Sequence, residues 1–475
     1  MAESVKADLC IIGAGSGGLS IAAGAAQLGV RVVLFERGKM GGDCLNYGCV
    51  PSKSLLAAAK AASAVRNAGK FGIKVPPPHV DFPRVIEHVN RTIAAIAPHD
   101  SVERFEGLGV RVIRAEARFT GPREVAGGGA IVRARRFVIA TGAAPLIPPI
   151  PGVDLVSFFT NETIFSNTKL PEHLLIIGGG PIGIEMAQAF CRLGAKVTVF
   201  EAETILARED PELRDRLREV LLAEGVDLHE RAKVVSVRDS GPGIMLTIET
   251  RNGEQHVEGS HLLIAVGRAP RVDALDLEKA GIEFNRKGIK VDAGLRTTNR
   301  RVYAIGDAIE GPQFTHVANY HAGLVIRSAL FRMPARVDYR ALPAVTYTDP
   351  ELAQVGLTEA AARKQHGDDV EVLHAPFLHN DRAETELETG GMIKVMVRKN
   401  GTILGASILG PHAGELIYPW ILLLGQKAKL RALTGMIAPY PTLGEIGKRV
   451  ASHFYSPKLF SKWPRRIVKF LQYFG

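Results

Sequence analysis

Two cysteines five positions apart, Cys44 and Cys49, are the residues of this chain best suited to chemistry. They stand just before the run LLAAA at residues 55–59, which is typical of a helix. Pro51 fits the first turn of that helix, where its missing N–H is not needed. We therefore expect Cys49 at or next to a helix N-terminus, whose partial positive charge favours a thiolate. A thiol pair with one activated member is suited to disulfide exchange.

The composition is that of a multidomain globular protein, with 475 residues of which 46% are hydrophobic and 23% charged. The Cys-x4-Cys pair has no further cysteine or histidine nearby, which is too few ligands for zinc, so no metal site is predicted. No stretch reaches the roughly 20 apolar residues of a membrane span. Four cysteines are too few for a disulfide-stapled secreted protein, and a strand begins by Ala7 with no signal peptide before it. We therefore expect a cytoplasmic location.

The elements expected to position the cysteine pair begin with strand, turn, helix and strand over residues 8–36. The apolar run 9–12 is typical of a buried parallel strand, and the run 32–35 forms a second strand that ends at Glu36. The glycines of the turn let the backbone approach a pyrophosphate at the helix N-terminus, and Glu36 can bond a ribose hydroxyl. The turn contains Gly13, Gly15, Ser16 and Gly18.

The same arrangement recurs 165 residues later. An apolar strand at 174–177 is followed by a glycine turn and a helix, and the next strand ends at Glu201. In both units the acidic residue stands 23 positions after the first glycine, so two dinucleotide sites are predicted on two domains. The glycines of the second turn are Gly178, Gly180 and Gly183.

Three more apolar runs end in small residues or an acid, and beyond residue 342 the pattern changes. Strand-like runs at 393–397 and 403–409 flank Asn400-Gly401, a pair typical of a hairpin turn. The fold class is therefore α/β, with two Rossmann-like dinucleotide-binding domains and a C-terminal α+β domain. The residues that end the three runs are Thr141 and Gly142, Gly267, and Gly306 with Asp307.

Together these motifs resemble the flavin-dependent pyridine nucleotide–disulfide oxidoreductases, which include dihydrolipoamide dehydrogenase, glutathione reductase and mercuric reductase. The resemblance covers roughly residues 6–452 and extends to the motifs at 347–352 and 355–359. It implies a dimerisation role for the C-terminal domain. The domains are then predicted as 1–152 (FAD-binding, first part), 153–270 (NAD(P)-binding), 271–338 (return to the FAD domain), 339–455 (dimerisation) and 456–475 (basic tail).

The resemblance also implies cofactors and roles. The first glycine unit, Gly42, Lys53 and the segments at 141–142 and 306–307 would hold FAD, and the second unit with Gly267 would hold NAD(P)H. Cys49 would be the charge-transfer thiolate and Cys44 the thiol that exchanges with substrate. Lys53 would lie near the flavin ring and pair with Glu185.

Glu201 bears on the choice of nucleotide. A carboxylate suits a free 2′-hydroxyl and repels a 2′-phosphate, which favours NADH. Arg208, seven positions later, could offset that repulsion and leaves NADPH open.

One departure from the family limits the choice of substrate. Tyr440 stands where the lipoamide and glutathione enzymes have a catalytic histidine, although the following Glu445 is present. A phenol with a pKa near ~10 is a poor proton acceptor at neutral pH, so Tyr440 would orient substrate or only pack at a dimer interface. Mercuric reductases share the tyrosine, but the C-terminal cysteine pair that delivers Hg(II) in them is missing from this sequence. Asp43, where the family usually has threonine, is a second departure.

The last twenty residues lie outside the resemblance, and seven of the ten excess positive charges lie in the last thirty residues. No acidic residue follows Glu445, whereas seven basic residues do. Trp463, Ile467 and Phe470 begin an apolar helix face, with arginines and a lysine opposite, which suits an anionic membrane surface. Docking of that face on the protein's own dimer is the favoured alternative. No nucleic-acid-binding module is recognisable.

The sequence therefore predicts a homodimeric FAD enzyme that passes electrons from NAD(P)H through Cys49 and Cys44 to a small-molecule disulfide or a similar two-electron acceptor. The alternatives are a lipoamide enzyme proper, a mercuric reductase, and a transhydrogenase, which the cysteine pair disfavours. An alternative of another class is a redox sensor docked at the inner face of the membrane through its tail.

Overall fold

The computed structural model of the protein describes residues 2–251 and 253–474. Met1, Asn252 and Gly475, which belong to the predicted segments 1–152, 153–270 and 456–475, lie outside the described residues. The chain forms two compact units. Unit 1 contains the residues up to Ala202 together with His229–Val337, and unit 2 contains Glu203–Leu228 and the residues from Asp338 onward.

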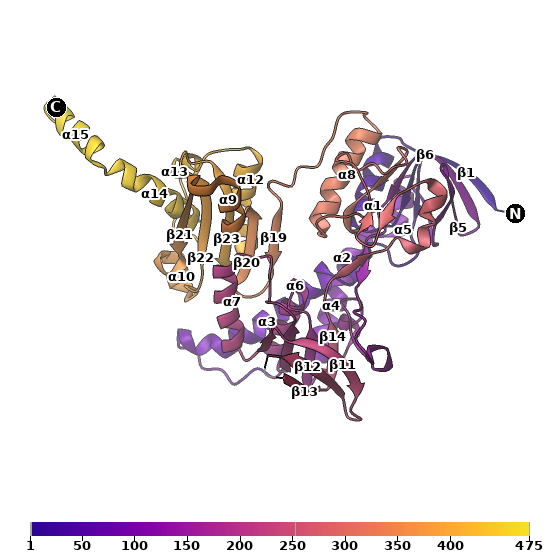
Figure 1. The fold of residues 1–475 in the computed structure, drawn as a ribbon, viewed down its shortest axis with the longest axis horizontal. Helices are drawn as coiled ribbons and strands as arrows, with labels where there is room; N and C mark the ends of the chain where they lie inside the picture. Colours follow the sequence, from indigo (N-terminus) through magenta and orange to yellow (C-terminus); the bar gives the residue numbers. More distant parts are fainter. Residues whose placement is uncertain (1, 252, 475) are drawn as a thin grey trace. The chain divides into compact units, whose positions relative to one another are not determined.

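Unit 1 is built on a seven-stranded sheet in the order β3-β2-β1-β6-β5-β4, with β18 also paired to β6 (Figure 1). The strands that carry the first glycine unit are parallel, and β4, β5 and β6 form an antiparallel meander. Residues 9–12 of β1 are buried, as the sequence predicted. The strands are β1 (Glu3–Ile12), β2 (Val32–Phe35), β3 (Arg111–Ile113), β4 (Arg118–Gly121), β5 (Glu124–Gly127), β6 (Ala130–Ile139) and β18 (Val302–Ala304).

The second glycine unit supplies another sheet of unit 1, in the order β10-β9-β8-β14. Strands β8, β9 and β14 are parallel, and a three-stranded antiparallel sheet, β11-β12-β13, follows β10 in the chain. These strands are β8 (His173–Ile177), β9 (Lys196–Glu201), β10 (Asp227–Glu230), β11 (Lys233–Asp239), β12 (Ile244–Thr250), β13 (Gly253–Gly259) and β14 (His261–Ile264). Two short pairs are β7 (Ala143–Pro145) with β15 (Arg268–Pro270) and β16 (Phe284–Asn285) with β17 (Gly288–Ile289).

The helices of unit 1 include one after each glycine turn and two that carry the cysteine motif. Helices α1 and α6 follow the two glycine turns, and α2 and α3 contain Cys44 and Cys49. The helices are α1 (Ser16–Gln27), α2 (Gly42–Asn46), α3 (Cys49–Asn67), α4 (Phe82–Ile96), α5 (Val102–Gly107), α6 (Pro181–Leu193) and α8 (Thr315–Ala329).

Unit 2 contains a five-stranded antiparallel sheet in the order β19-β20-β23-β22-β21. The predicted hairpin around Asn400-Gly401 is confirmed, because β22 and β23 pair on either side of it and Gly401 has a positive φ of 81°. The strands are β19 (Pro343–Thr346), β20 (Glu351–Gly356), β21 (Val370–Pro376), β22 (Met392–Arg398) and β23 (Ile403–Gly410). The mixed α/β fold with a C-terminal α+β domain is thereby confirmed.

The helices of unit 2 come mainly from the C-terminal part of the chain. Trp420 of α12 and Phe454 of α14 are buried in the core that covers the sheet. The helices are α7 (Pro211–Ala223), α9 (Glu359–His366), α10 (Asp381–Glu386), α11 (Ala413–Leu416), α12 (Tyr418–Gly425), α13 (Arg431–Thr434), α14 (Glu445–Leu459) and α15 (Lys462–Leu471). Among the described residues, no helix is long and apolar enough to cross a membrane.

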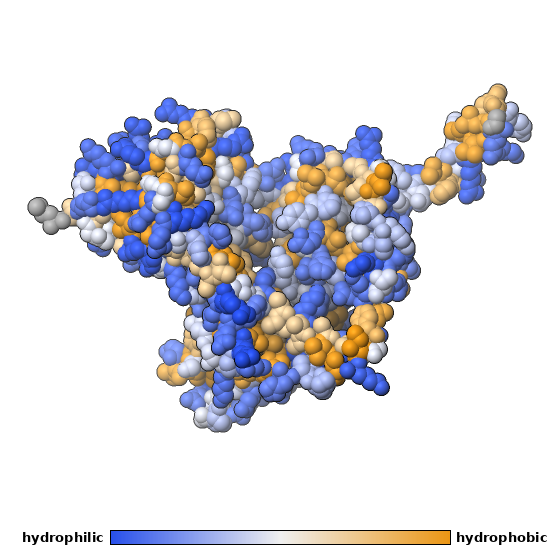
Figure 2. All heavy atoms as spheres, turned by 180° about the vertical axis from the view of Figure 1, so that it is seen from behind, coloured by the Kyte–Doolittle hydropathy of each residue, from blue (hydrophilic) through white to orange (hydrophobic). Residues whose placement is uncertain are grey.

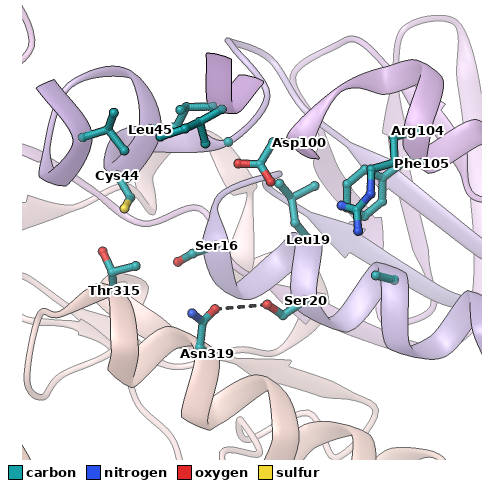
Figure 3. A pocket seen from close by; sticks show the side chains of 14 residues that line it. Ser16, Leu19, Ser20, Cys44, Leu45, Asp100, Arg104, Phe105, Thr315 and Asn319 are labelled. Atoms are coloured by element: carbon teal, nitrogen blue, oxygen red, sulfur yellow. Dashed lines mark hydrogen bonds between the residues drawn. The ribbon is translucent and has the colours of Figure 1, made fainter. Parts of the chain in front are cut away.

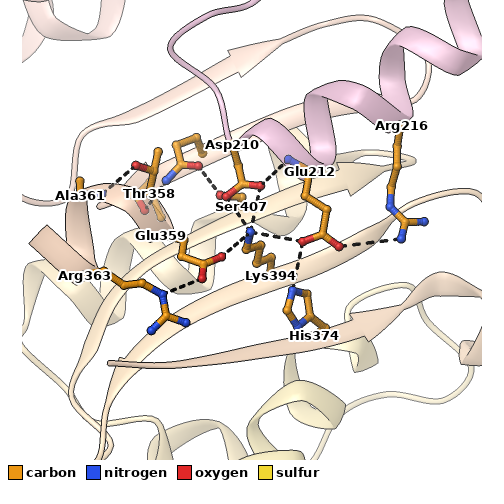
Figure 4. A network of polar contacts seen from close by, with 12 residues as sticks. Asp210, Glu212, Arg216, Thr358, Glu359, Ala361, Arg363, His374, Lys394 and Ser407 are labelled. Carbon is orange, nitrogen blue, oxygen red and sulfur yellow. Dashed lines mark hydrogen bonds and ion pairs between the residues drawn. The ribbon is translucent and has the colours of Figure 1, made fainter. Parts of the chain in front are cut away.

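Helix α7 belongs to unit 2, although the sequence analysis assigned its residues to the segment 153–270. A buried ion-pair cluster explains this grouping (Figure 4). Nζ of Lys394, in β22, lies 3.1 Å from Oδ2 of Asp210 and 3.2 Å from Oε2 of Glu212, at the start of α7. The same ammonium lies 2.8 Å from Oε2 of Glu359 in α9, and Lys394 is only 4% exposed.

Candidate functional site

The two cysteines lie in two consecutive helices. The position of Cys49 at a helix N-terminus confirms the prediction from the sequence. Cys44 lies in the short helix α2, and Cys49 is the first residue of α3, with Pro51 in the first turn. The backbone N–H of Gly41, just before α2, donates to the carbonyl of Ala14 at 2.9 Å. The first glycine turn and the cysteine motif are therefore in direct contact.

The two thiols share one proton unequally. The pKa of Cys49 is lowered to about 6, chiefly by the hydrogen bond from Cys44 and also by Thr315 and Lys53, although burial and the charge of Asp43 oppose the shift. The hydroxyl of Thr315, the first residue of α8, lies 3.3 Å from Sγ of Cys49. The hydrogen bond to Cys49 and burial raise the pKa of Cys44. At neutral pH, Cys49 is therefore the thiolate and Cys44 keeps the proton, which the predicted roles require.

Asp43, the departure beside Cys44, is part of a charged cluster. Nη2 of Arg268 lies 3.2 Å from Oδ1 of Asp43, and Nε of the same guanidinium lies 3.7 Å from Oδ2 of Asp307. Asn161 also donates to Asp43 at 3.2 Å. Burial raises the pKa of Asp307, and the charge of Asp43 adds to that rise, while Arg268 opposes it. The cluster thus connects the cysteine motif to Asp307, which is one of the residues predicted to hold FAD.

A cavity of about 350 Å³ opens beside Cys44 (Figure 3). Its walls come from both cysteine-motif helices, from α1, from α8 and from the region of α4 and α5. Most of the wall is apolar, but Asp100 and Arg104 bring one carboxylate and one guanidinium to it. Burial raises the pKa of Asp100. A small substrate in this cavity would meet the Cys44 sulfur.

The first glycine unit has the features that a dinucleotide needs. Helix α1 begins after Gly15 with no side chain capping its N-terminus, so its first N–H groups are available to a phosphate. A Cβ on Gly13 would lie 2.4 Å from the carbonyl oxygen of Ala140, so the close approach requires glycine. One carboxylate oxygen of Glu36 accepts from the N–H of Ala14 at 2.7 Å, which holds the acid beside the turn. These residues fit FAD.

The second glycine unit repeats this geometry. A Cβ on Gly178 would lie 2.5 Å from the carbonyl oxygen of Ala265, and Glu201 accepts from the N–H of Gly179 at 2.7 Å. Helix α6 begins after Gly180, again without a side-chain cap. The duplication seen in the sequence is therefore a duplication in space, and these residues fit a second dinucleotide.

Lys53 and Glu185 form an ion pair in the structure, with 2.8 Å between Nζ and Oε2. Lys53 lies one turn after Cys49 in α3, and Glu185 is a buried residue of α6. The pair links the helix of the active cysteine to the helix of the second glycine unit.

The C-terminal candidates lie in unit 2. The hydroxyl of Tyr440 donates to Oδ2 of Asp381 at 2.9 Å, and this hydrogen bond raises the pKa of the exposed phenol. Glu445 begins α14 and accepts from the N–H of Thr442 at 3.4 Å. The hydrogen bond therefore keeps Tyr440 as a neutral phenol, the form that is a poor proton acceptor, and its role stays a prediction.

The remaining candidate residues lie in turns and in the first turns of helices in unit 1. Gly142, Gly267 and Gly306 have positive φ, and Thr141 donates to the carbonyl of Arg271 at 2.7 Å. Ser16 lines the cavity beside Cys44, and Gly42 begins α2. Gly18 and Gly183 are buried in α1 and α6.

Sequence reasoning missed three residues of this site: Thr315, Arg268 and Asp100. Arg268 directly follows Gly267, which the sequence did predict as a cofactor-binding residue. Thr315 and Asp100 carry no local signal, because the parts of the cysteine motif that they approach, Cys49 and Gly41, lie far away in the sequence.

Two family models match this chain, one over its N-terminal two thirds and one over its C-terminal domain. Residues 7–322 match the family model described as pyridine nucleotide-disulphide oxidoreductase, and residues 342–451 match the dimerisation domain of the same family. The matches cover nearly all of the chain up to the last helices.

Curated relatives and solved structures agree with the family models. A mercuric reductase of Streptomyces lividans is 38% identical over 94% of this chain and 96% of its own length. A dihydrolipoyl dehydrogenase of Geobacillus stearothermophilus is 35% identical, with the same two coverages. The solved HOCl-induced flavoprotein disulfide reductase RclA from Escherichia coli, as its Cu(II) complex, is similar with a TM-score of 0.85 and 29% identity, over 94% of this chain and 99% of its own.

Proposed function

This chain belongs to the pyridine nucleotide-disulphide oxidoreductase family, and on that premise we propose that it reduces a small organic disulfide in the cavity beside Cys44. It is an FAD-dependent enzyme that uses NAD(P)H, with a C-terminal dimerisation domain. When bound, FAD supplies the two-electron transfer between the nucleotide and the thiols. The observation that carries the acceptor proposal is the pairing of a thiolate at Cys49 with a protonated Cys44 in the wall of a cavity.

The exchange step balances as follows. Cys44 passes its proton to the Cys49 thiolate through their hydrogen bond, and the Cys44 sulfur attacks one sulfur of the substrate disulfide to form a mixed disulfide. The first substrate thiolate leaves and takes that proton from Cys49, which restores the Cys49 thiolate. The Cys49 thiolate then attacks Cys44, forms the internal disulfide and releases the second substrate thiolate, which takes a proton from water. Two electrons from NAD(P)H regenerate the dithiol. The apolar wall and the Asp100–Arg104 pair favour a substrate with an apolar body and a polar end.

We propose NADH as the preferred donor, because Glu201 is held at the second glycine turn, where a 2′-phosphate would meet its charge. In a Glu201→Ser variant, we expect the ratio of kcat/KM for NADH to kcat/KM for NADPH to fall by about tenfold. An unchanged ratio would contradict this assignment.

We also propose a cytoplasmic homodimer in which the segment with Tyr440 and Glu445 completes the partner's site. The dimerisation domain and the low cysteine content support this. Mixing a Cys44→Ser subunit with a Tyr440→Phe subunit tests it, because hybrid dimers would then keep one intact site in two.

The test of the acceptor is a turnover panel under anaerobic NADH, with lipoamide, glutathione disulfide, aromatic disulfides, Hg(II) and quinones. We expect one organic disulfide to turn over, and the Cys44→Ser variant to lose that activity while flavin reduction by NADH continues. Hg(II) turnover with no disulfide turnover would contradict the proposal and favour the activity named for the Streptomyces lividans relative.

A further inference from the structure

Helix α15 is an amphipathic helix whose apolar side is left unburied by the described residues of unit 2. It spans Lys462–Leu471 and contains no buried residue. The large aromatic and aliphatic side chains from Trp463 to Phe474 are between 43% and 79% exposed. Figure 1 draws α15 beyond α14 at the C-terminal end of the chain, and Figure 2 shows an apolar and a hydrophilic side to this segment.

The two faces of the helix differ sharply in chemistry. Successive residues turn by about 100° in a helix, which gathers Trp463, Ile467 and Phe470 with the neighbouring leucine on one side. The opposite side has four cations and no acid: Lys462, Arg465, Arg466 and Lys469. In the described part of the chain, none of these four side chains forms an ion pair with a carboxylate.

The helix also lies outside the shared family fold. The match to the dimerisation domain ends at residue 451, within α14, and α15 begins eleven residues later. The residues that form the dithiol site and the two dinucleotide sites all precede it. The exposed apolar face therefore has no place in the activity described above.

We propose that α15 docks on the surface of an anionic lipid bilayer, lying in the plane of the headgroups. A lipid surface covers both faces at once, because the acyl boundary takes the aromatic and aliphatic side and the anionic headgroups pair with the four cations. A second copy of this chain would cover the apolar face but would have to supply carboxylates for the cations. With ten residues, α15 is too short to cross a bilayer.

The two tryptophans of the chain allow a direct test on the full-length holoenzyme. Trp420 is 1% exposed in the core of unit 2, whereas Trp463 is 72% exposed in α15. On adding phosphatidylglycerol-containing vesicles, we expect the emission of Trp463 to shift to shorter wavelength and the protein to sediment with the vesicles. Vesicles of phosphatidylcholine alone, or high salt, should give a much weaker response. The Trp463→Phe variant should lose the spectral shift while it still sediments.

Two variants separate the contributions. Arg465→Glu/Arg466→Glu and Phe470→Asp/Leu471→Asp are each expected to lower vesicle binding by about tenfold or more, with disulfide turnover unchanged. Lys74→Glu/Arg91→Glu and Leu155→Asp, which change exposed residues of unit 1, are matched controls that should bind as the unchanged protein does. No binding to anionic vesicles, equal binding by the α15 variants, or a change of dimer mass in those variants without vesicle binding would overturn the proposal. None of these outcomes depends on which disulfide is the acceptor.

Discussion

Arg268 forms an ion pair with Asp43, the residue directly before Cys44, with 3.2 Å between Nη2 and Oδ1. The sequence showed that Asp43 departs from the family pattern, but it did not reveal whether Asp43 raises or lowers the pKa of the thiols. In the structure, the charge of the Asp43 carboxylate raises the pKa of both Cys44 and Cys49. The same guanidinium lies 3.7 Å from Asp307, so Arg268 connects the two carboxylates.

Replacing Asp43 with asparagine is therefore expected to lower the pKa of Cys49 below its value of about 6. The measurement is a pH titration of the long-wavelength absorption band of the two-electron-reduced enzyme. Asp154→Asn, which changes an exposed carboxylate of unit 1, serves as the control and should titrate as the unchanged protein does. A rise in the Cys49 pKa would contradict this electrostatic account.

The hydroxyl of Thr315 should matter in the opposite direction. It lies 3.3 Å from Sγ of Cys49 and stabilises the thiolate, so Thr315→Val is expected to raise the Cys49 pKa. In the unchanged protein the thiolate is present above about pH 6 and is lost as the pH falls through that value. In Thr315→Val the loss should begin at higher pH, and Thr315→Ser should restore the original profile. An unshifted profile in the valine variant would exclude this hydrogen bond as a cause.

Lys53→Met would leave the buried carboxylate of Glu185 without its 2.8 Å ion partner. We expect a loss of about 1–3 kcal/mol in the free energy of unfolding, because a buried carboxylate that loses a hydrogen-bonded cation is less well stabilised in the folded protein. The same change should raise the Cys49 pKa, since Lys53 lowers it. Lys53→Met/Glu185→Gln should recover part of the stability but not the pKa, and urea unfolding with the thiolate titration measures both. Full recovery of the pKa would contradict the direct charge effect.

Lys394→Met should destabilise unit 2 by about 3–5 kcal/mol, because it leaves carboxylates facing one another in a buried site. The hydrogen bond from Lys394 lowers the pKa of Glu359 below its usual value of 4.5, so the stabilising pair is present above that pH and is lost as the pH falls through the lowered value. The deficit of the variant should therefore be largest near neutral pH and shrink in acid. Lys399→Met, at an exposed site, is the control for thermal unfolding across pH. A pH-independent deficit would contradict the ionic origin.

Much of the fold followed from local spacing. The strand runs, the helix start at Cys49, the hairpin at residues 400–401 and the amphipathic helix after residue 461 depend on periodicity and turn chemistry within a few residues. The grouping of α7 with the C-terminal sheet did not follow, because it depends on the burial of one lysine, Lys394, among carboxylates from two distant segments.

The sequence by itself determined the chemistry of the site: a thiol pair at a helix start and two glycine turns, each followed at 23 residues by an acid. Only the tertiary structure decided which thiol holds the proton, which charges act on it and what space lies beside it. Thr315 and Cys49 are 266 residues apart, and Arg268 of strand β15 reaches Asp43 of helix α2. Electrostatic effects of this kind depend on distances of a few ångströms, which spacing along a chain does not record.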